Sequence, residues 1–239
     1  MSTIALIGAD GSGKTTIANR LLAEQPIRLK YLYMGLNIES SNHSLITSKL
    51  IYYYKVRKYK KKLGINGSLK KQNLSLHDLN DERLPDSRGK LGATLRTLNR
   101  IAEQSYRQII AWIYQLRGQV ILFDRHFLFD GAIDEAQTQK SNERLSDRFY
   151  HFMLTRVFPK PDITIFLFAP AEVLFSRKGE ANLEYLDAKN QSMMNIGTLV
   201  DNFIKIDATQ PLEKVYSDVK TTIVNFHNHK TKNQLVAEL

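Results

Sequence analysis

The sequence has no cysteine among its 239 residues and only one tryptophan. Without cysteine, neither a disulfide framework nor a thiolate metal site can form. Long apolar runs are also missing. The longest, at 163–175, contains a proline and a glutamate and is too short to span a bilayer. No basic stretch precedes the short apolar run of the N-terminal MSTIALIG, so we expect no cleaved signal peptide and a cytoplasmic protein.

Composition indicates a folded protein that attracts anions. With 43% apolar and 24% charged residues, the chain can bury the core of one large domain. Its formal charge of +10 and pI near 9.6 favour nucleotides, phosphorylated sugars, nucleic acid or an acidic lipid surface as partners. Charge alone does not choose among them.

Short apolar runs alternate with longer segments of helical spacing. The runs lie at 3–7, 120–123, 163–168 and 203–206, with a weaker one at 29–33, and helices are predicted at 14–23, 45–63, 91–116, 142–157, 182–200 and 212–226. Such alternation predicts an α/β fold, a doubly wound parallel sheet of five strands with helices on both faces. We expect a single domain over 1–239, with a basic helical insertion at about 37–90, a short lid at about 177–185 and a frayed tail from His227.

A glycine-rich loop follows the first predicted strand. Its letters, GADGSGKT, fit G-x-x-x-x-G-K-[ST], and the loop opens the first predicted helix as this P-loop motif requires. Glycines let backbone N–H groups converge on phosphate oxygens, and the helix N-terminus adds partial positive charge. The predicted nucleotide-binding residues are Gly8, Ala9, Asp10, Gly11, Ser12, Gly13, Lys14, Thr15 and Thr16.

The motif and one strand end predict ATP and Mg²⁺ as ligands. Lys14 would reach the β- and γ-phosphates, and the Thr15 hydroxyl would ligate the magnesium ion. Asp124 ends the predicted strand at 120–123, at the edge of a parallel sheet where ligands bind. We therefore predict that Asp124 organises the magnesium ion and its waters.

Four segments together resemble the thymidylate kinase-like proteins of the nucleoside monophosphate kinase superfamily. They are GADGSGKTT at 8–16, FDRH at 123–126, the stretch from PKPDITIFLFAP to RKGE at 159–180, and KIDATQPLEKV at 205–215. The resemblance covers 4–22 and about 91–226. It implies P-loop kinase activity, with ATP and a small phosphoryl acceptor as substrates.

The resemblance also implies site residues on the acceptor side. Arg125 matches an arginine that clamps the acceptor phosphate, and Asp10 matches an acidic residue that faces the acceptor sugar hydroxyl. Arg177 and Lys178 lie at the lid position, where cations close over the transferred phosphoryl group; the alternative is a solvated helix end. His126 is expected to pack or to hydrogen-bond rather than to act as an acid or base; the alternative is a direct ligand.

Three further side chains have two interpretations each. Asp130 is either an acceptor or magnesium contact or a helix N-cap. Arg100 and Arg107, from the predicted helix at 91–116, are either acceptor contacts, as an arginine of this helix is in the family, or surface charges.

The chain departs from the family where the acceptor is recognised. The Arg-Glu-Pro-Gly-Gly-Thr stretch of thymidylate kinases is missing, and YLYMGLN at 31–37 and a basic run at 55–62 stand in its place. Lys160-Pro161-Asp162 and RKGE at 177–180 look more like the divergent thymidylate kinase-like proteins of bacterial surface-polysaccharide gene clusters. These differences indicate retained catalysis with rebuilt acceptor recognition.

The sequence thus predicts an ATP-dependent phosphotransferase that moves the γ-phosphoryl group of Mg-ATP to a nucleoside monophosphate or similar phosphorylated acceptor. One alternative is a kinase of a sugar or lipid-linked glycan, and another is a non-catalytic nucleotide-binding or membrane-docking protein. The missing Asn-Lys-x-Asp motif disfavours a regulatory GTPase. Nucleic acid is a disfavoured partner. The 55–62 run either contacts an anionic membrane or a phosphorylated glycan, or is a solvated helix face, and analogy with related kinases suggests a homodimer.

Overall fold

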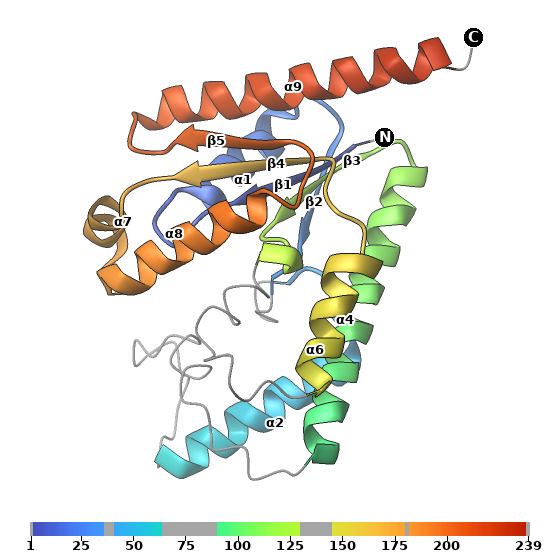
Figure 1. The fold of residues 1–239 in the computed structure, drawn as a ribbon, viewed down its shortest axis with the longest axis vertical. Coiled ribbons are helices and arrows are strands. Elements are labelled where there is room, and N and C mark those ends of the chain that lie inside the picture. The colour runs from blue at the N-terminus through green and yellow to red at the C-terminus, as the bar shows by residue number, and fades with distance from the viewer. Residues whose placement is uncertain (1, 36–40, 64–89, 130–144, 180–181, 238–239) are drawn as a thin grey trace.

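The computed structural model describes residues 2–35, 41–63, 90–129, 145–179 and 182–237 (Figure 1). In chain order the elements are β1 (Thr3–Ile7), α1 (Lys14–Glu24), β2 (Leu29–Tyr33), α2 (Ile46–Leu63), α4 (Lys90–Leu116), β3 (Val120–Asp124), α6 (Leu145–Phe152), β4 (Ile163–Phe168), α7 (Ala171–Lys178), α8 (Leu183–Gly197), β5 (Phe203–Asp207) and α9 (Leu212–Ala237). A π-helical turn, Met153–Val157, continues α6.

The five strands form one sheet in the order β2-β3-β1-β4-β5, and every neighbouring pair is parallel. The register places Leu6 of β1 opposite Asp124 of β3 and Ile165 of β4. Because all strands run the same way, their carboxyl ends share one edge of the sheet. The loop at 8–13 and Asp124 therefore lie at the same edge.

Alternate residues of each strand enter two separate cores. Leu6, Ile165 and their equivalents pack with α1 and α9 on one face of the sheet. Ile7, Phe123 and their equivalents pack with α4 and α8 on the other face. Burial on both faces explains why the three central strands, β1, β3 and β4, read as nearly continuous apolar runs. The predicted five-stranded doubly wound α/β fold with helices on both faces is confirmed.

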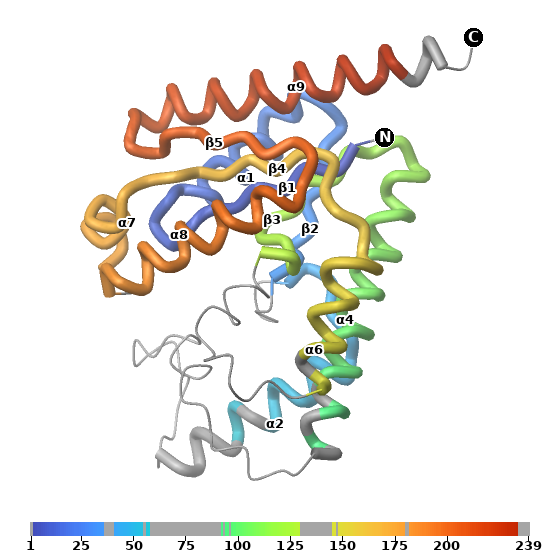
Figure 2. The backbone as a smooth tube through the Cα atoms, in the orientation of Figure 1, coloured from blue at the N-terminus to red at the C-terminus, as the bar shows by residue number. Residues whose placement is uncertain are grey.

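The C-terminal helix is longer than the sequence predicted. We expected a helix to residue 226 and a frayed tail from His227, but α9 continues to Ala237. Lys230 pairs with Asp162 at 2.5 Å, so the extension has a partner outside α9. In Figure 2 the red tube of α9 runs along one side of the sheet.

Two other predicted helices end differently. The helix predicted at 182–200 stops at Gly197, where an added Cβ would lie 2.8 Å from the Phe203 ring, so this close approach requires glycine. The helix predicted at 142–157 is described from Leu145 and changes to a π-helical turn at Met153.

The predicted insertion and lid are described in part. The insertion contributes α2, which lies with the start of α4 on the side of the molecule away from α9 (Figure 2). Most side chains of the 55–62 run, all of 64–89 and Asp130 lie outside the described residues. At the lid position, α7 ends with Gly179 in a left-handed conformation, φ 65°, and α8 begins after the N-cap Asn182.

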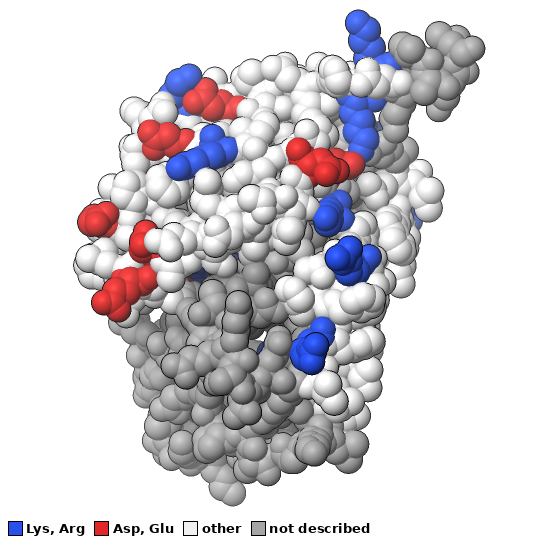
Figure 3. All heavy atoms as spheres, viewed as in Figure 1, with Lys and Arg blue, Asp and Glu red and all other residues white. Residues whose placement is uncertain are grey.

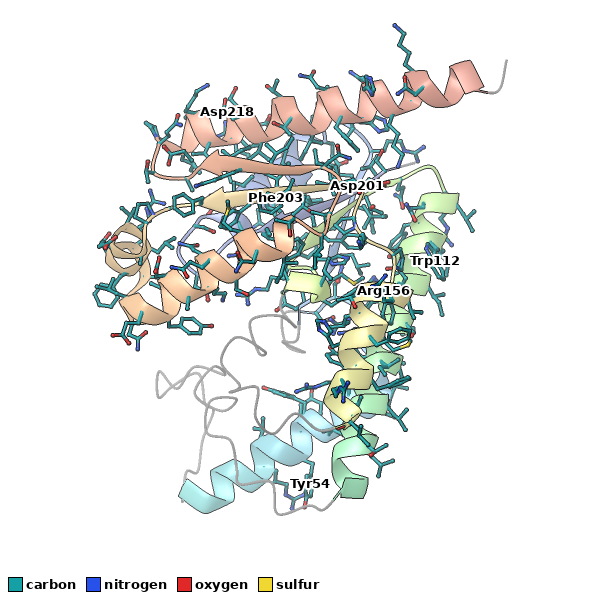
Figure 4. All side chains as sticks on the ribbon, viewed as in Figure 1. Tyr54, Trp112, Arg156, Asp201, Phe203 and Asp218 are labelled. Carbon is teal, nitrogen blue, oxygen red and sulfur yellow. The ribbon has the colours of Figure 1, made fainter. Side chains whose placement is uncertain are left out.

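Helix α4 carries an exposed apolar stripe along the described part of its surface. Its exposed members are Leu95 and Leu98 near the start of the helix and Ile109, Trp112, Ile113 and Leu116 toward its end. Figure 4 shows Trp112 on the outer side of α4. Among the helices that the structure describes, none combines the length and the apolar character needed to cross a bilayer.

Charges of both signs lie on the face of the molecule shown in Figure 3. Described acidic side chains gather over α7, α8 and the start of α9, and described basic side chains lie mainly toward α4, α6 and the far end of α9. On the described part of this face, the net positive charge of the chain does not form one continuous basic surface.

Candidate functional site

The glycine-rich loop packs tightly between the sheet and α7. A Cβ on Gly8 would lie 2.5 Å from Ser12 Oγ and 2.7 Å from the Leu167 carbonyl oxygen, and one on Gly11 would lie 2.8 Å from the Leu174 carbonyl oxygen. Gly13 caps α1 in a left-handed conformation and provides no side-chain hydrogen bond. The first backbone N–H groups of α1 are thus available to an anion, and their partial positive charge favours one.

Lys14 lies inside this loop, and its side chain is buried. Its Nζ donates to the carbonyl oxygens of Gly8 at 2.7 Å and Ala9 at 2.9 Å. Burial, reinforced by repulsion from the Arg125 guanidinium, lowers the pKa of Lys14 to about 7. The Lys14 ammonium thus donates to carbonyl oxygens of its own loop. When a nucleotide enters, the same N–H groups can donate to phosphate oxygens instead.

Asp10 joins two cations from distant parts of the chain. Its Oδ1 accepts from Arg125 Nη2 at 2.8 Å, and its Oδ2 accepts from Lys189 Nζ at 3.0 Å. Burial opposes ionisation of Asp10, but Lys189, Arg125 and Lys14 together hold its pKa far below the usual range. The carboxylate is therefore ionised at neutral pH.

Arg125 adopts a backbone conformation that is unusual for a residue with a Cβ. Its φ is 56°, in the left-handed region, immediately after β3. Such a conformation costs roughly 1–2 kcal/mol in a residue other than glycine. The strained turn directs the guanidinium back toward the loop after β1, where it meets Asp10.

Asp124 ends β3 and is almost fully buried. Its Oδ2 accepts a hydrogen bond from the Tyr31 hydroxyl at 2.8 Å. Burial of Tyr31, with the Asp124 charge beside it, raises the pKa of the phenol. Tyr31 therefore stays protonated and fixes the orientation of the carboxylate.

The residues predicted to bind magnesium have suitable chemistry. Mg²⁺ prefers oxygen ligands and usually takes only one or two from the protein, with phosphates and waters completing the octahedron. Asp124 offers a carboxylate, and the Thr15 side chain is exposed at the start of α1. No cluster of three or more His, Asp or Glu residues suited to a metal occurs among the described residues.

Arg177 reaches a different part of the sheet edge from Asp10. Its Nη1 donates to the Ala208 carbonyl oxygen at 2.8 Å, which connects α7 to the loop after β5. In that loop, Thr209 donates to Asp207 through its backbone N–H and its hydroxyl. Lys178 is exposed at the end of α7. The structure thus brings Arg177 to the 207–211 loop and does not bring it into contact with Asp10.

The two arginines of α4 differ. Arg107 is buried and donates to the carbonyl oxygens of Gly35 at 2.6 Å and His43 at 3.1 Å, and it pairs with Glu103 at 2.9 Å. The interpretation of Arg107 as a surface charge is wrong, because the guanidinium holds the segment after β2 against α4. Arg100 is exposed, with its guanidinium 5.9 Å from the centre of the Tyr150 ring.

His126 packs inside the core below the site. Its ring centre lies 4.1 Å from that of Phe127 and 5.2 Å from that of Phe123, and burial lowers its pKa to about 3. Its Nδ1 accepts from the Leu128 backbone N–H at 3.4 Å, so we assign the proton to Nε2, which has no partner among the described residues. A neutral, enclosed imidazole of this kind supports packing.

We expect His126 to make the protein sensitive to acid. Because its pKa is lower in the folded state than the ordinary 6.5, unfolding takes up a proton below pH 6.5, and the stability is lost as the pH falls toward 3. The loss is about 1.4 kcal/mol per pH unit. Denaturant unfolding of the wild type and of His126→Leu gives the free energy of unfolding at each pH between 7 and 4. This free energy should fall less steeply with decreasing pH in His126→Leu, by the amount just given. Equal slopes in the two proteins would contradict the assignment.

Sequence reasoning missed Lys189 and Tyr31. Lys189 lies on the buried face of α8, where Leu186 and Met193 occupy neighbouring turns, so a lysine in an apolar helical stripe was the available signal. Tyr31 belongs to the weakest predicted strand, and nothing in its local sequence indicates a carboxylate partner. Both residues reach the site through tertiary contacts.

A comparison of the sequence with protein-family models gives no match, and a comparison with curated proteins gives none either. The strand order and the parallel sheet are compatible with the P-loop NTPase fold.

Proposed function

We propose that the chain is an ATP-dependent phosphotransferase of the thymidylate kinase-like type, which transfers the γ-phosphoryl group of Mg-ATP to a nucleoside monophosphate or similar phosphorylated acceptor. The observation that carries this proposal is the pairing of Asp10 in the glycine-rich loop with Arg125 from the end of β3. Asp10 would face an acceptor hydroxyl and Arg125 would bind an acceptor phosphate. Both lie at the glycine-rich loop, which would bind the triphosphate of ATP.

The donor side of the proposed reaction uses the loop and the start of α1. Backbone N–H groups at 8–15 and the Lys14 ammonium would bind the phosphate chain, since fixed donors and charge neutralisation dominate phosphoryl transfer. Thr15 and Asp124 would hold Mg²⁺, which supplies positive charge between the phosphates. We assign the adenine of ATP to the 207–211 loop, which the Arg177 guanidinium contacts through the Ala208 carbonyl oxygen.

The reaction needs no base when the acceptor is a phosphate. An acceptor phosphate oxygen attacks the γ-phosphorus, the bond between that phosphorus and the β–γ bridging oxygen breaks, and ADP leaves with the electron pair. Neither Asp10, whose pKa is held far below the usual range, nor the enclosed His126 suits removal of a hydroxyl proton. A phosphate acceptor therefore needs no proton acceptor at this site.

The other predictions about partners stay predictions. A sugar or lipid-linked glycan as acceptor and a non-catalytic role are outcomes that the acceptor screen below distinguishes. Docking of the 55–62 run on an anionic membrane remains a prediction from the sequence. A homodimer would have the apolar stripe of α4 as a suitable surface.

An acceptor screen with γ-³²P-labelled ATP and Mg²⁺ tests the proposed function. The acceptors are the common nucleoside monophosphates, sugar phosphates, free sugars and a lipid-linked glycan. We expect label in a nucleoside diphosphate or another phosphorylated acceptor. Transfer only to hydroxyl groups would favour the glycan kinase, and labelled inorganic phosphate alone would exclude a phosphotransferase.

We expect nucleotide binding to take up a proton on Lys14. With a pKa of about 7 in the free protein, near half of the Lys14 side chains are neutral at pH 7, and the phosphates would raise that pKa. Calorimetry in buffers of different ionisation enthalpy should give a proton uptake that increases from pH 6 to pH 8. Proton release, or an uptake independent of pH, would contradict this expectation.

A further inference from the structure

Lys189 is buried although lysine is among the residue types least often found inside proteins. Its side chain is only 5% exposed. It lies on the face of α8 that packs on the molecule, and the neighbouring Asn190 donates through Nδ2 to the Ala169 carbonyl oxygen at 2.9 Å. That contact fixes this turn of α8 just beyond the carboxyl end of β4. Helix packing therefore places the Lys189 ammonium at the edge of the sheet that holds the glycine-rich loop.

The charge of Lys189 is compensated only in part by its described neighbours. Its Nζ donates to Asp10 Oδ2 at 3.0 Å and lies 3.5 Å from the Tyr185 hydroxyl. An ammonium has three donors, and burying one costs several kcal/mol unless a counter-charge fully offsets the loss of water. Asp10 cannot provide that offset alone, because its other oxygen pairs with Arg125.

The geometry of the cluster suits an anion with several oxygens. One carboxylate bridges two cations, each through a separate oxygen, and the Lys14 ammonium adds a third positive charge that lowers the pKa of the same carboxyl. A pair of residues that served only to attach α8 to the loop would need one cation and one carboxylate. Two convergent cations with one shared carboxylate match the donors that hold a phosphate dianion.

We propose that Lys189 acts with Arg125 as a second ligand for the anionic group of the acceptor. Until that group binds, the Asp10 carboxylate pairs with both cations. This inference rests on the proposed function. It identifies a phosphate monoester as the ligand class of the acceptor site. When the monoester binds, its oxygens accept hydrogen bonds from Arg125 and Lys189 in place of Asp10. The Asp10 carboxylate can then accept a hydrogen bond from an acceptor hydroxyl.

Inorganic phosphate is the probe for this site. The protein is first titrated with Mg-ADP to fill the glycine-rich loop, and the saturated complex is then titrated calorimetrically with phosphate. We expect one phosphate per chain. Lys189→Gln should weaken phosphate binding roughly ten- to hundredfold, the loss of one charge-assisted hydrogen bond. The affinity for Mg-ADP should change less than about threefold, and Lys189→Arg should restore phosphate binding.

Asp10→Asn is expected to have the opposite effect on phosphate affinity. This variant still tests the inference if Lys189→Gln fails to fold. Removing the competing carboxylate should tighten phosphate binding, whereas a purely structural ion pair would lose affinity or stability. Lys49→Gln, an exposed lysine of α2, is the matched control and should change neither affinity. Unchanged phosphate binding in Lys189→Gln, or weaker binding in Asp10→Asn, overturns the inference.

The two proposals fail separately in this experiment. Absence of Mg-ADP binding would overturn the proposed function. The phosphate titration of the nucleotide-free protein, compared among wild type, Lys189→Gln and Asp10→Asn, would then decide the role of Lys189 by itself.

Discussion

Replacing Lys14 by methionine is expected to lower the rate constant of phosphoryl transfer, kcat, at least 10²- to 10³-fold, roughly the loss seen when one fixed donor to a transition state is removed. Methionine keeps an unbranched apolar stem in the buried position but provides no charge for the β- and γ-phosphates. The carbonyl oxygens of Gly8 and Ala9 lose the Nζ donor, but the burial cost of an ammonium is also removed. These two effects oppose each other, so the melting temperature should change by only a few degrees.

Steady-state transfer with the acceptor found in the screen, together with thermal unfolding, measures both quantities. Lys49→Met, at an exposed position of α2, is the control for loss of a lysine and should keep full activity. A Lys14→Met protein that is folded and retains more than about a tenth of the wild-type kcat would contradict the role of Lys14.

Replacing Arg125 by alanine is expected to reduce kcat/KM for the acceptor about 10²-fold or more, while the KM for ATP changes less than about threefold. Arg125 contacts Asp10 and follows the end of β3 beside the glycine-rich loop. Its loss should therefore impair use of the acceptor more than binding of ATP. Equal losses for ATP and acceptor would mean that Arg125 supports the loop as a whole.

The backbone of Arg125 gives this test an internal control. Because φ is 56° at this position, Arg125→Gly should be more stable than Arg125→Ala by about 1 kcal/mol, since glycine adopts the left-handed region without a Cβ penalty. Both variants should lose acceptor use equally. Denaturant unfolding measures the difference, and an alanine variant as stable as the glycine variant would show that the conformation is not strained.

The fold was predictable because burial on both sheet faces makes the three central strands, β1, β3 and β4, nearly continuous apolar runs. The place of Asp124 followed from the same argument, since strand ends of a parallel sheet share one edge. The glycine-rich loop was predictable because its chemistry is contained in eight consecutive letters, GADGSGKT.

The remaining parts of the site depend on contacts that no local pattern encodes. Lys189 meets Asp10 across 179 positions, and Tyr31 meets Asp124 across 93. Arg107 could be assigned to its helix from the sequence, but its burial against the segment after β2 depends on how α4 packs. The length of α9 was underestimated because its polar residues gain partners, such as Asp162 for Lys230, only in the folded chain.

Calorimetric titration with a non-hydrolysable Mg-ATP analogue tests most directly whether the segment from Gly8 to Thr15 binds a triphosphate. One analogue per chain should bind to the wild-type protein, and Lys14→Met should weaken that binding severalfold or more while the protein stays folded. No detectable binding to the wild-type protein, or equal affinity in the wild type and Lys14→Met, would contradict the account.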